Sequence, residues 1–119
     1  MSEVKYKAIK YIRISNADDK SGESNSVANQ RRLIDEFLLK HPEIEVVGEK
    51  IDDGWTGVIF ERPAFMEMLE EIKEGNVNCC VTKDLSRFGR EYIETLRYLR
   101  KIFPDFGVRF IAINEETFF

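Results

Sequence analysis

Apolar and polar stretches alternate along the chain in a pattern that predicts strands and helices in turn. A period-two run with β-branched residues predicts a first strand over Tyr6–Ile14. Apolar residues at helical spacing predict a helix over Val27–Lys40. The segment between them, Asn16–Asn25, is polar and contains a glycine, so we expect a loop that is mobile in the free domain.

The same alternation continues to the end of the chain. Further strands are predicted over Ile44–Asp52, Val77–Lys83 and Val108–Ile113, with helices from Pro63 to Gly75 and over Tyr92–Phe103. This order favours a single α/β domain over residues 1–119, with a mostly parallel central sheet flanked by helices. Ligand sites in such sheets lie beyond the carboxyl ends of the strands. Ser15 and the stretch KDLSRFGRE, which starts at Lys83, both fall at such ends.

Composition narrows the functions that the fold can serve. The net charge is −4 and the pI is about 5.1, so the chain does not coat nucleic acid through bulk charge, and any anion site must be local. No run of ~18 apolar residues and no apolar signal core occurs, and a cytoplasmic protein is therefore the default expectation.

Residues that bind metals are few. Cys79 and Cys80 are adjacent, a spacing that disfavours a disulfide, and both are expected to pack as small hydrophobes. With His41 as the single histidine, no thiolate–imidazole metal site can form, and we expect no cofactor. A Mg²⁺ site remains an alternative, because paired carboxylates near strand ends can bind this ion. The acidic residues near the predicted strand ends are Asp18, Asp19, Asp52 and Asp53.

The cations of KDLSRFGRE are unusual in an acidic chain. Arg87 and Arg90 are three residues apart and share one face if the segment is helical, either as a solvated helix start or as an anion site with Lys83. Arginine suits phosphate because its planar fork donates two parallel hydrogen bonds and stays charged. Arg62, just before Pro63, adds another fork from a different loop.

The end of the first strand also carries chemistry. Tyr11, Arg13 and Ser15 project to the same side of a strand, which presents a serine hydroxyl beside a guanidinium. The alternative is an ordinary strand terminus. Gln30, on the first helix, faces back toward the strand ends, where it is either a buried polar contact or a phosphate ligand.

Four separated motifs resemble the catalytic domain of serine recombinases: YIRIS, SNSVANQ, DDGWTG followed by ERP, and VTKDLSRFGRE. The resemblance runs from about Tyr6 to Asn114. The segments SGESNSVANQ, KDLSRFGRE and VRFIAIN are most similar to the large serine recombinases of transposons, the TnpX-like transposases. Ser86 stands where resolvases carry an acidic residue, which leaves any general acid or base open, and Thr56 replaces a more usual serine.

The resemblance implies that Ser15 attacks a DNA phosphodiester and forms a covalent phosphoserine link, without metal or ATP. Four arginines would surround the scissile phosphate, namely Arg13, Arg62, Arg87 and Arg90. Supporting or phosphate-binding roles would fall to Tyr11, Gln30, Asp53, Lys83 and Ser86. Without DNA, Ser15 and the Arg87–Arg90 pair are expected to lie too far apart for a hydrogen bond.

The resemblance also implies partners. Similar enzymes continue into a long helix that makes dimer and synaptic tetramer contacts and then into DNA-binding domains, so residues 1–119 are expected to be a fragment. Alone, the chain should be inactive in recombination, monomeric or weakly associating, and should bind DNA weakly, without sequence preference. A metal-dependent nuclease and a non-catalytic α/β binding module remain the alternatives.

Overall fold

The computed structural model of the protein describes residues 3–15, 25–115 and 117–118. One five-stranded sheet has the order β2-β1-β3-β4-β5. The strands are β1 (Tyr6–Ile14), β2 (Ile44–Asp53), β3 (Cys79–Thr82), β4 (Arg109–Ala112) and β5 (Thr117–Phe118). The first four are parallel, and β5 runs antiparallel to β4. The predicted α/β fold with a mostly parallel sheet is confirmed, whereas β5 was not predicted.

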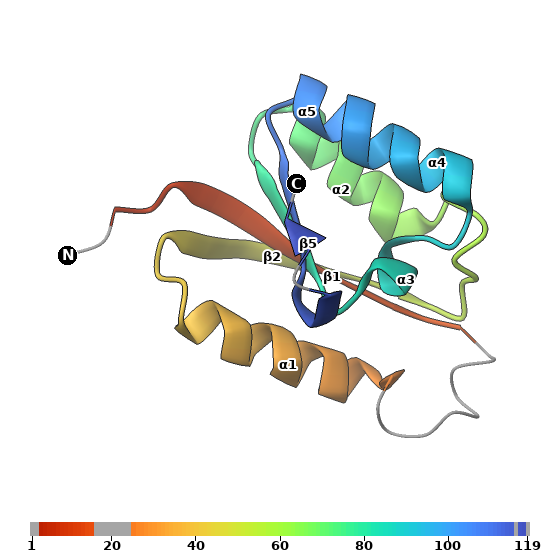
Figure 1. The fold of residues 1–119 in the computed structure, drawn as a ribbon, viewed down its shortest axis with the longest axis horizontal. Coiled ribbons are helices and arrows are strands. Elements are labelled where there is room, and N and C mark those ends of the chain that lie inside the picture. The colour runs from red at the N-terminus through yellow and green to blue at the C-terminus, as the bar shows by residue number, and fades with distance from the viewer. Residues whose placement is uncertain (1–2, 16–24, 116, 119) are drawn as a thin grey trace.

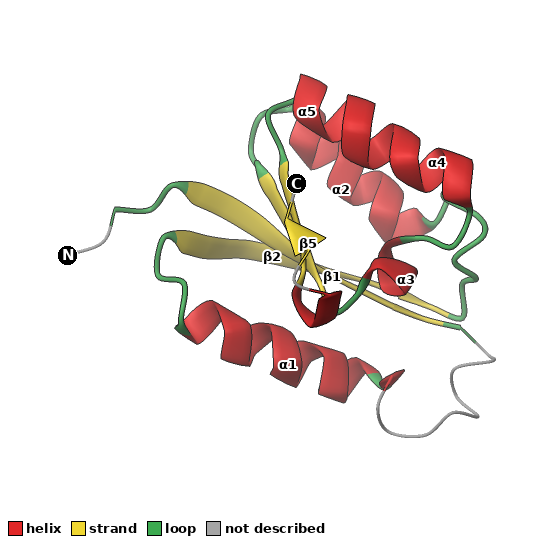
Figure 2. Cartoon of the chain, viewed as in Figure 1, coloured by secondary structure: helices red, strands yellow, loops and turns green. Residues whose placement is uncertain are grey.

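Helices cover both faces of the sheet (Figures 1 and 2). They are α1 (Val27–Leu39), α2 (Pro63–Lys73), α3 (Leu85–Phe88), α4 (Tyr92–Arg97) and α5 (Phe103–Asp105), with a π-helical turn (Tyr98–Ile102) and a 3-10 turn (Ile113–Glu115). In the figures α1 lies on one side of the sheet, and α2, α4 and α5 lie on the other. The short helix α3 follows β3 directly, so it lies at the carboxyl end of that strand.

Local signals explain where the two long helices begin. The Ser26 hydroxyl accepts a hydrogen bond from the Asn29 amide at 3.0 Å and so caps α1. Pro63 occupies the first turn of α2, where its missing N–H costs nothing. Helix α1 ends at Leu39, within one residue of the predicted end.

The central strand β1 has a buried core on each face. Ala8 and Ile12 pack with Ile34 of α1, whereas Ile9 and Tyr11 pack on the side of α2. The second core is rich in aromatic rings, which are Phe60, Phe65, Phe88, Tyr98, Phe103 and Phe110. Strand β1 is therefore buried on both faces, and Ser15 directly after it is also buried.

The adjacent cysteines behave as predicted. Cys79 belongs to the core beneath α1 and Cys80 to the opposite core, because neighbouring strand residues point to opposite faces. Both thiols are free and buried, and burial raises the pKa of Cys79 to about 12. They therefore pack as small hydrophobes.

One predicted helix is irregular, and a second helix lies where the sequence had left the structure open. The helix predicted over Tyr92–Phe103 starts at Tyr92, but it passes through the π-helical turn at Tyr98–Ile102 and continues to Asp105. Helix α3 has only four residues, too few for apolar periodicity to reveal it.

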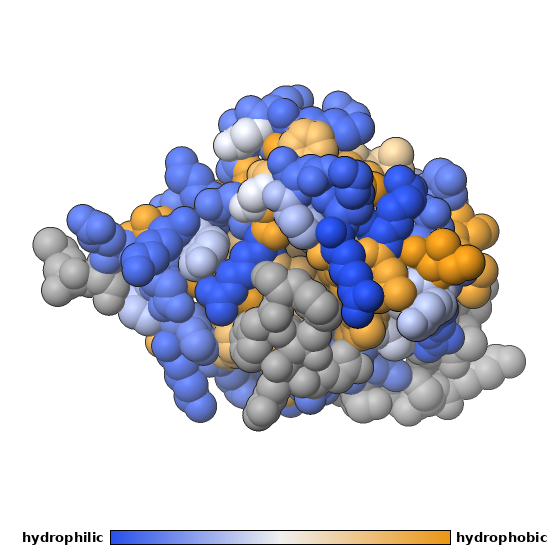
Figure 3. All heavy atoms as spheres, turned by 45° about the horizontal axis from the view of Figure 1, so that its top comes forward, coloured by the Kyte–Doolittle hydropathy of each residue, from blue (hydrophilic) through white to orange (hydrophobic). Residues whose placement is uncertain are grey.

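The face shown in Figure 3 is mostly hydrophilic, with apolar atoms gathered toward its right side. Exposed apolar side chains of the whole molecule include Val58 and Ile59 before α2, and Tyr92 and Ile93 at the start of α4. In the described part of the chain, no helix combines the length and the apolar character needed to span a bilayer.

Candidate active site

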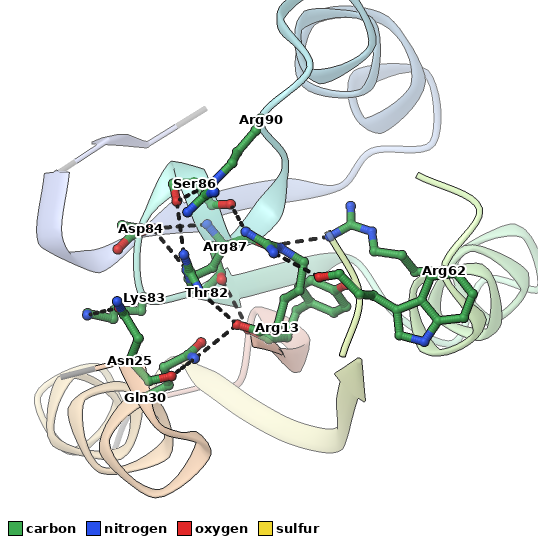
Figure 4. Close-up of polar contacts among 12 residues, drawn as sticks. Arg13, Asn25, Gln30, Arg62, Thr82, Lys83, Asp84, Ser86, Arg87 and Arg90 are labelled. Atoms are coloured by element: carbon green, nitrogen blue, oxygen red, sulfur yellow. Dashed lines mark hydrogen bonds and ion pairs between the residues drawn. The ribbon is translucent and has the colours of Figure 1, made fainter. Parts of the chain in front are cut away.

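Three parts of the chain meet beyond the carboxyl ends of β1 and β3. They are the end of β1, the residues from Lys83 to Arg90, and the start of α1 (Figure 4). Their meeting follows from the parallel register, which pairs Lys10 of β1 with Val81 of β3 and so brings both strand ends to one edge. The sequence prediction that these stretches lie together is thereby confirmed.

Ser15 follows directly after β1 and is only 9% exposed. Tyr11 and Arg13, which share its alternation along the strand, are fully buried. The residues after Ser15 up to Ser24, which are all but the last residue of the loop predicted to be mobile, lie outside the described residues. The expected separation of Ser15 from the arginines without DNA stays a prediction.

Arg87 lies on α3 and is 2% exposed. Its Nη1 donates to the carbonyl oxygen of Arg13 at 3.0 Å, and its Nη2 donates to the Ser86 hydroxyl at 3.3 Å. Asp84 caps α3 by accepting from the Arg87 amide at 3.0 Å, and its carboxylate lies 3.8 Å from Arg87 Nε. The guanidinium is therefore held beside the strand end that carries Ser15.

Arg90 is exposed and does not share a helix with Arg87, so the condition for a common helical face is not met. Gly89 between them has extended backbone, with φ −176°, and ends α3. The two arginines nevertheless converge, because Arg90 Nε donates to the Ser86 hydroxyl at 3.5 Å. Ser86 thus accepts from both guanidinium groups (Figure 4).

Gln30 and Lys83 connect α1 to the strand ends. Gln30 is fully buried, and its Nε2 donates to the carbonyl oxygens of Arg13 at 3.0 Å and Asn25 at 2.8 Å. Lys83, 8% exposed, donates from Nζ to the side-chain oxygen of Asn25 at 2.9 Å. Gln30 is therefore at least a buried polar contact, one of its two predicted roles. Asn25 was not foreseen, because only the fold brings it to Lys83.

Arg13 and Arg62 lie differently from Arg90. Both are fully buried, and both donate to backbone carbonyl oxygens near α3. Arg62 also lies over the rings of Phe60 and Phe65, with its guanidinium carbon 4.8 and 4.9 Å from their centroids. Burial lowers the pKa of Arg62.

The acidic residues near the strand ends separate into different environments. Asp52 is buried and accepts from the Tyr11 hydroxyl at 2.7 Å and from the amides of Ala64 and Phe65 at 2.8 and 3.0 Å. It therefore caps α2, while Asp53 beside it is exposed. Burial raises the pKa of Tyr11, and the Asp52 carboxylate raises it further.

The alternative of a metal site has no supporting cluster of ligands in the part of the chain that is described. There, no three His, Cys, Asp or Glu side chains lie close enough together to hold a metal ion. Asp18 and Asp19, the other acidic pair of that reading, lie outside the described residues.

Two further residues shape the site and were missed. Asp84, directly before α3, is an N-cap residue type, so its role was readable from the sequence. Gly57 is buried against the site: a Cβ there would stand 2.9 Å from Arg13 Nη2 and 2.9 Å from Arg90 Cγ. Its carbonyl oxygen accepts from the Arg90 amide at 2.8 Å. Only the fold reveals that close approach.

Comparison with known proteins identifies similar molecules. Residues 8–118 match the family described as Resolvase, N terminal domain. A resolvase family site-specific recombinase from Streptococcus pneumoniae is 32% identical, with a TM-score of 0.78, and the match covers 96% of this chain and 76% of that one. No curated protein matches the sequence.

Two more distant structures share the fold. The N-terminal catalytic domain of TP901-1 integrase has a TM-score of 0.83 at 22% identity, covering 94% of this chain and 80% of that chain. The C-terminal catalytic domain of ISC1926 TnpA, an IS607-like serine recombinase, has a TM-score of 0.69 at 20% identity, with 90% and 70% covered.

Proposed function

The chain belongs to the resolvase N-terminal domain family, and on that premise we propose that it is the catalytic domain of a site-specific DNA recombinase with Ser15 as nucleophile. The observation that carries the proposal is the convergence of Arg87 and Arg90 on the Ser86 hydroxyl, beside the strand end that bears Ser15. A chain of net charge −4 gathers cations there, as a site for one phosphate requires.

In the proposed reaction, Ser15 Oγ attacks a DNA phosphorus atom and the bond from phosphorus to the 3′ oxygen breaks. The serine hydroxyl loses its proton, the departing 3′ oxygen gains one, and the 5′ phosphate stays attached to Ser15. The reverse step, with the 3′ hydroxyl of another strand, rejoins the DNA. The phosphoester is conserved throughout, so the exchange needs no ATP.

Arg87 and Arg90 would stabilise the charge that develops on the phosphoryl oxygens and favour the serine alkoxide. Arg87 is suited to this because its contacts hold it before DNA arrives. Arg90 is suited to it because it is exposed and can reach an incoming phosphate. Lys83, Gln30 and Asp53 would support the site.

The proposal extends to the setting of the reaction. From the motifs SGESNSVANQ and VRFIAIN we propose a large, TnpX-like enzyme of a mobile element. It would act on DNA in the bacterial cytoplasm, as a dimer that pairs into a synaptic tetramer, with DNA-recognition domains outside residues 1–119.

Trapping the protein–DNA adduct tests the nucleophile. The protein that carries this chain is incubated with end-labelled DNA, denatured and digested, and the labelled peptide is sequenced by mass spectrometry. We expect a nucleotide on Ser15, and loss of the adduct with retained DNA binding in Ser15→Ala. Tyr92→Phe, which removes an exposed hydroxyl, is the matched control and should form the adduct normally. A nucleotide on any other residue would reject the assignment.

The same assay tests the need for metal. Adduct formation should continue in EDTA, because the arginines are proposed to supply the positive charge that Mg²⁺ provides in other enzymes of phosphoryl transfer. Activity lost in EDTA and restored by Mg²⁺ alone would support the metal-dependent nuclease instead, with Asp18, Asp19, Asp52 and Asp53 as the ligands to examine.

A further inference from the structure

The outer face of α1 is left uncovered by the rest of the described chain. Figures 1 and 2 show α1 on one side of the sheet and α2, α4 and α5 on the other. Ile34 of α1 packs in the core beneath the helix and is fully buried, whereas Leu39 is 85% exposed. A single exposed leucine needs no explanation, but its neighbours on this face form a pattern that does.

Four residues of α1 form an exposed stripe along the helix: Ala28, Arg32, Asp35 and Leu39. They are four, three and four residues apart, which is the alternation found in the seam between paired helices. Arg31 and Glu36 flank the stripe, and all six side chains line a shallow hollow of about 500 Å³. We call these six residues the α1 face.

The α1 face is complementary to itself. When two copies of α1 lie antiparallel about a two-fold axis with their midpoints aligned, Ala28 opposes Leu39 of the second copy, and Arg32 opposes Asp35 of the second copy. The symmetry repeats each contact, so the seam has two pairs of a small and a large side chain and two pairs of opposite charge. A parallel pair would instead place each residue against its own copy, with like charges together.

We propose that the α1 face binds the α1 face of a second copy of this chain in an antiparallel, two-fold pair. The partner is identified by the order of charge and size along the helix, which matches its own reverse. This contact is distinct from the contacts expected of a long helix after residue 119, and it does not depend on the proposed function.

The charges of the α1 face remain available for a second partner. Within the chain, Arg32 pairs with Glu36 at 2.9 Å, and Asp35 pairs with Lys10 at 2.9 Å. The Arg32 and Asp35 side chains are nevertheless 59% and 52% exposed. Arg31 would lie near Glu36 of the second copy on the flank of the seam. The α1 face therefore carries balanced charge, although the chain as a whole has a net charge of −4.

The contact is small, so we expect it to be weak. Two helices of 13 residues bury much less surface than the ~1,600 Å² of a standard interface. Exposed ion pairs add little to the free energy of association. The pairing should therefore appear at high protein concentration, or where other contacts already hold two copies close together.

Sedimentation equilibrium of the 119-residue chain up to about 1 mM is the first test. The unsubstituted chain should form dimers as its concentration rises. Arg32→Asp and Asp35→Arg should each weaken the dimer about tenfold or more, because each turns two attractive pairs into repulsive ones. Arg100→Asp is the matched control, since it reverses an exposed charge between α4 and α5 on the other side of the sheet, and it should change nothing. A chain that stays monomeric, or a dimer that Arg32→Asp leaves intact, would overturn the proposal.

Mixing the two weakened variants is the second test, and it does not depend on a loss of binding. Each variant repels its own copy, but Arg32→Asp and Asp35→Arg together restore opposite charges at both central positions of the seam. The mixture should therefore form a heterodimer at least about tenfold tighter than either homodimer. A misfolded variant could not gain affinity in this way. A mixture that associates no better than its components would contradict the pairing.

Disulfide trapping tests the antiparallel register. Ala28→Cys mixed with Leu39→Cys should form a covalent heterodimer under mild oxidation, because the two positions oppose each other. Ala28→Cys alone should not crosslink, since its two copies would stand about 16 Å apart along the helix pair. The native Cys79 and Cys80 are buried and do not compete. Efficient crosslinking of Ala28→Cys to itself, with none in the mixture, would show a parallel contact and reject the proposed arrangement.

Discussion

Arg13 and Arg87 are hydrogen-bonded to each other in both directions across 74 residues of sequence. Arg13 Nε donates to the Arg87 carbonyl oxygen at 3.1 Å, and Arg87 Nη1 donates to the Arg13 carbonyl oxygen at 3.0 Å. Gln30 Nε2 donates to the same Arg13 carbonyl oxygen at 3.0 Å. The end of β1, the start of α1 and helix α3 are therefore fixed as one unit next to Ser15.

The variants Arg87→Ala and Arg90→Ala should differ in stability, although we expect both to lose activity. Removing either preorganised donor is expected to slow adduct formation by about 10²–10³-fold. Arg90→Ala should change the free energy of unfolding by less than about 0.5 kcal/mol, because the side chain is exposed. Arg87→Ala should lower it by about 2 kcal/mol through the loss of buried bonds. Urea unfolding beside the adduct assay measures both, and equal stability losses would contradict this reading.

Position 89 requires glycine because the aromatic core leaves no space for a side chain there, and not because of its backbone angles. A Cβ at this position would overlap the ring of Phe60, although the φ of −176° suits any residue. Gly89→Ala should therefore lower the free energy of unfolding by about 1–3 kcal/mol through overpacking. Gly48→Ala is the matched control, because its Cβ would meet only Ile9 Cγ1 at 3.7 Å. Thermal unfolding of the two variants tests this, and similar melting temperatures would refute it.

Substitutions of the neighbouring aspartates Asp52 and Asp53 should have different effects, one on stability and the other on activity. Asp52→Asn replaces a carboxylate that accepts three hydrogen bonds, and should lower the free energy of unfolding by about 1–3 kcal/mol. Asp53→Asn, at an exposed position, should leave stability within about 0.5 kcal/mol. If Asp53 supports the site as proposed, its variant should instead form less adduct. A destabilised Asp53→Asn with normal activity would reverse these assignments.

Glu49 should make the fold sensitive to acid. Hydrogen bonding from Arg31 lowers the pKa of Glu49 below its ordinary value of 4.5, and together with the contribution of Lys10 it outweighs the opposing effect of burial. A lowered folded-state pKa stabilises the protein above about pH 4.5, and that stabilisation is lost as the pH falls through the folded-state value. Glu49→Gln should therefore be less stable than the unsubstituted chain at pH 7, and the difference should shrink below pH 4.5. A difference that stays constant with pH would exclude this linkage.

Much of the fold was predictable because it depends on local patterns. The first strand, Tyr6–Ile14, has the predicted bounds, and Ile44–Asp53 is one residue longer than predicted. Strand β5 was missed because two residues carry no usable periodicity. The π-helical turn at Tyr98–Ile102 was missed because its side chains keep a helical spacing in the sequence.

The meeting of the two stretches at the strand ends was predictable, and the arrangement of their side chains was less so. The sequence placed Ser15, Arg13 and Arg87 at strand ends, and the parallel sheet brings those ends together. It could not show that Arg13 and Arg62 are fully buried, because arginine is ordinarily an exposed residue. Their partners are backbone carbonyl groups, which every residue possesses and no sequence pattern marks.

The central position of β1 has a consequence for synthesis on the ribosome. Its neighbour β2 leaves the ribosome soon after it, but its other neighbour follows much later: the Thr82 hydroxyl bonds to the Tyr11 carbonyl oxygen across 71 residues. Until then the nascent chain carries an apolar strand with one open edge, which is a hazard for pairing with other chains. Closing so distant a contact is also slow in folding. Ser15 therefore lies at the end of an incompletely paired strand until β3 (Cys79–Thr82) has left the ribosome, and the residues that α3 places beside that strand end arrive later still.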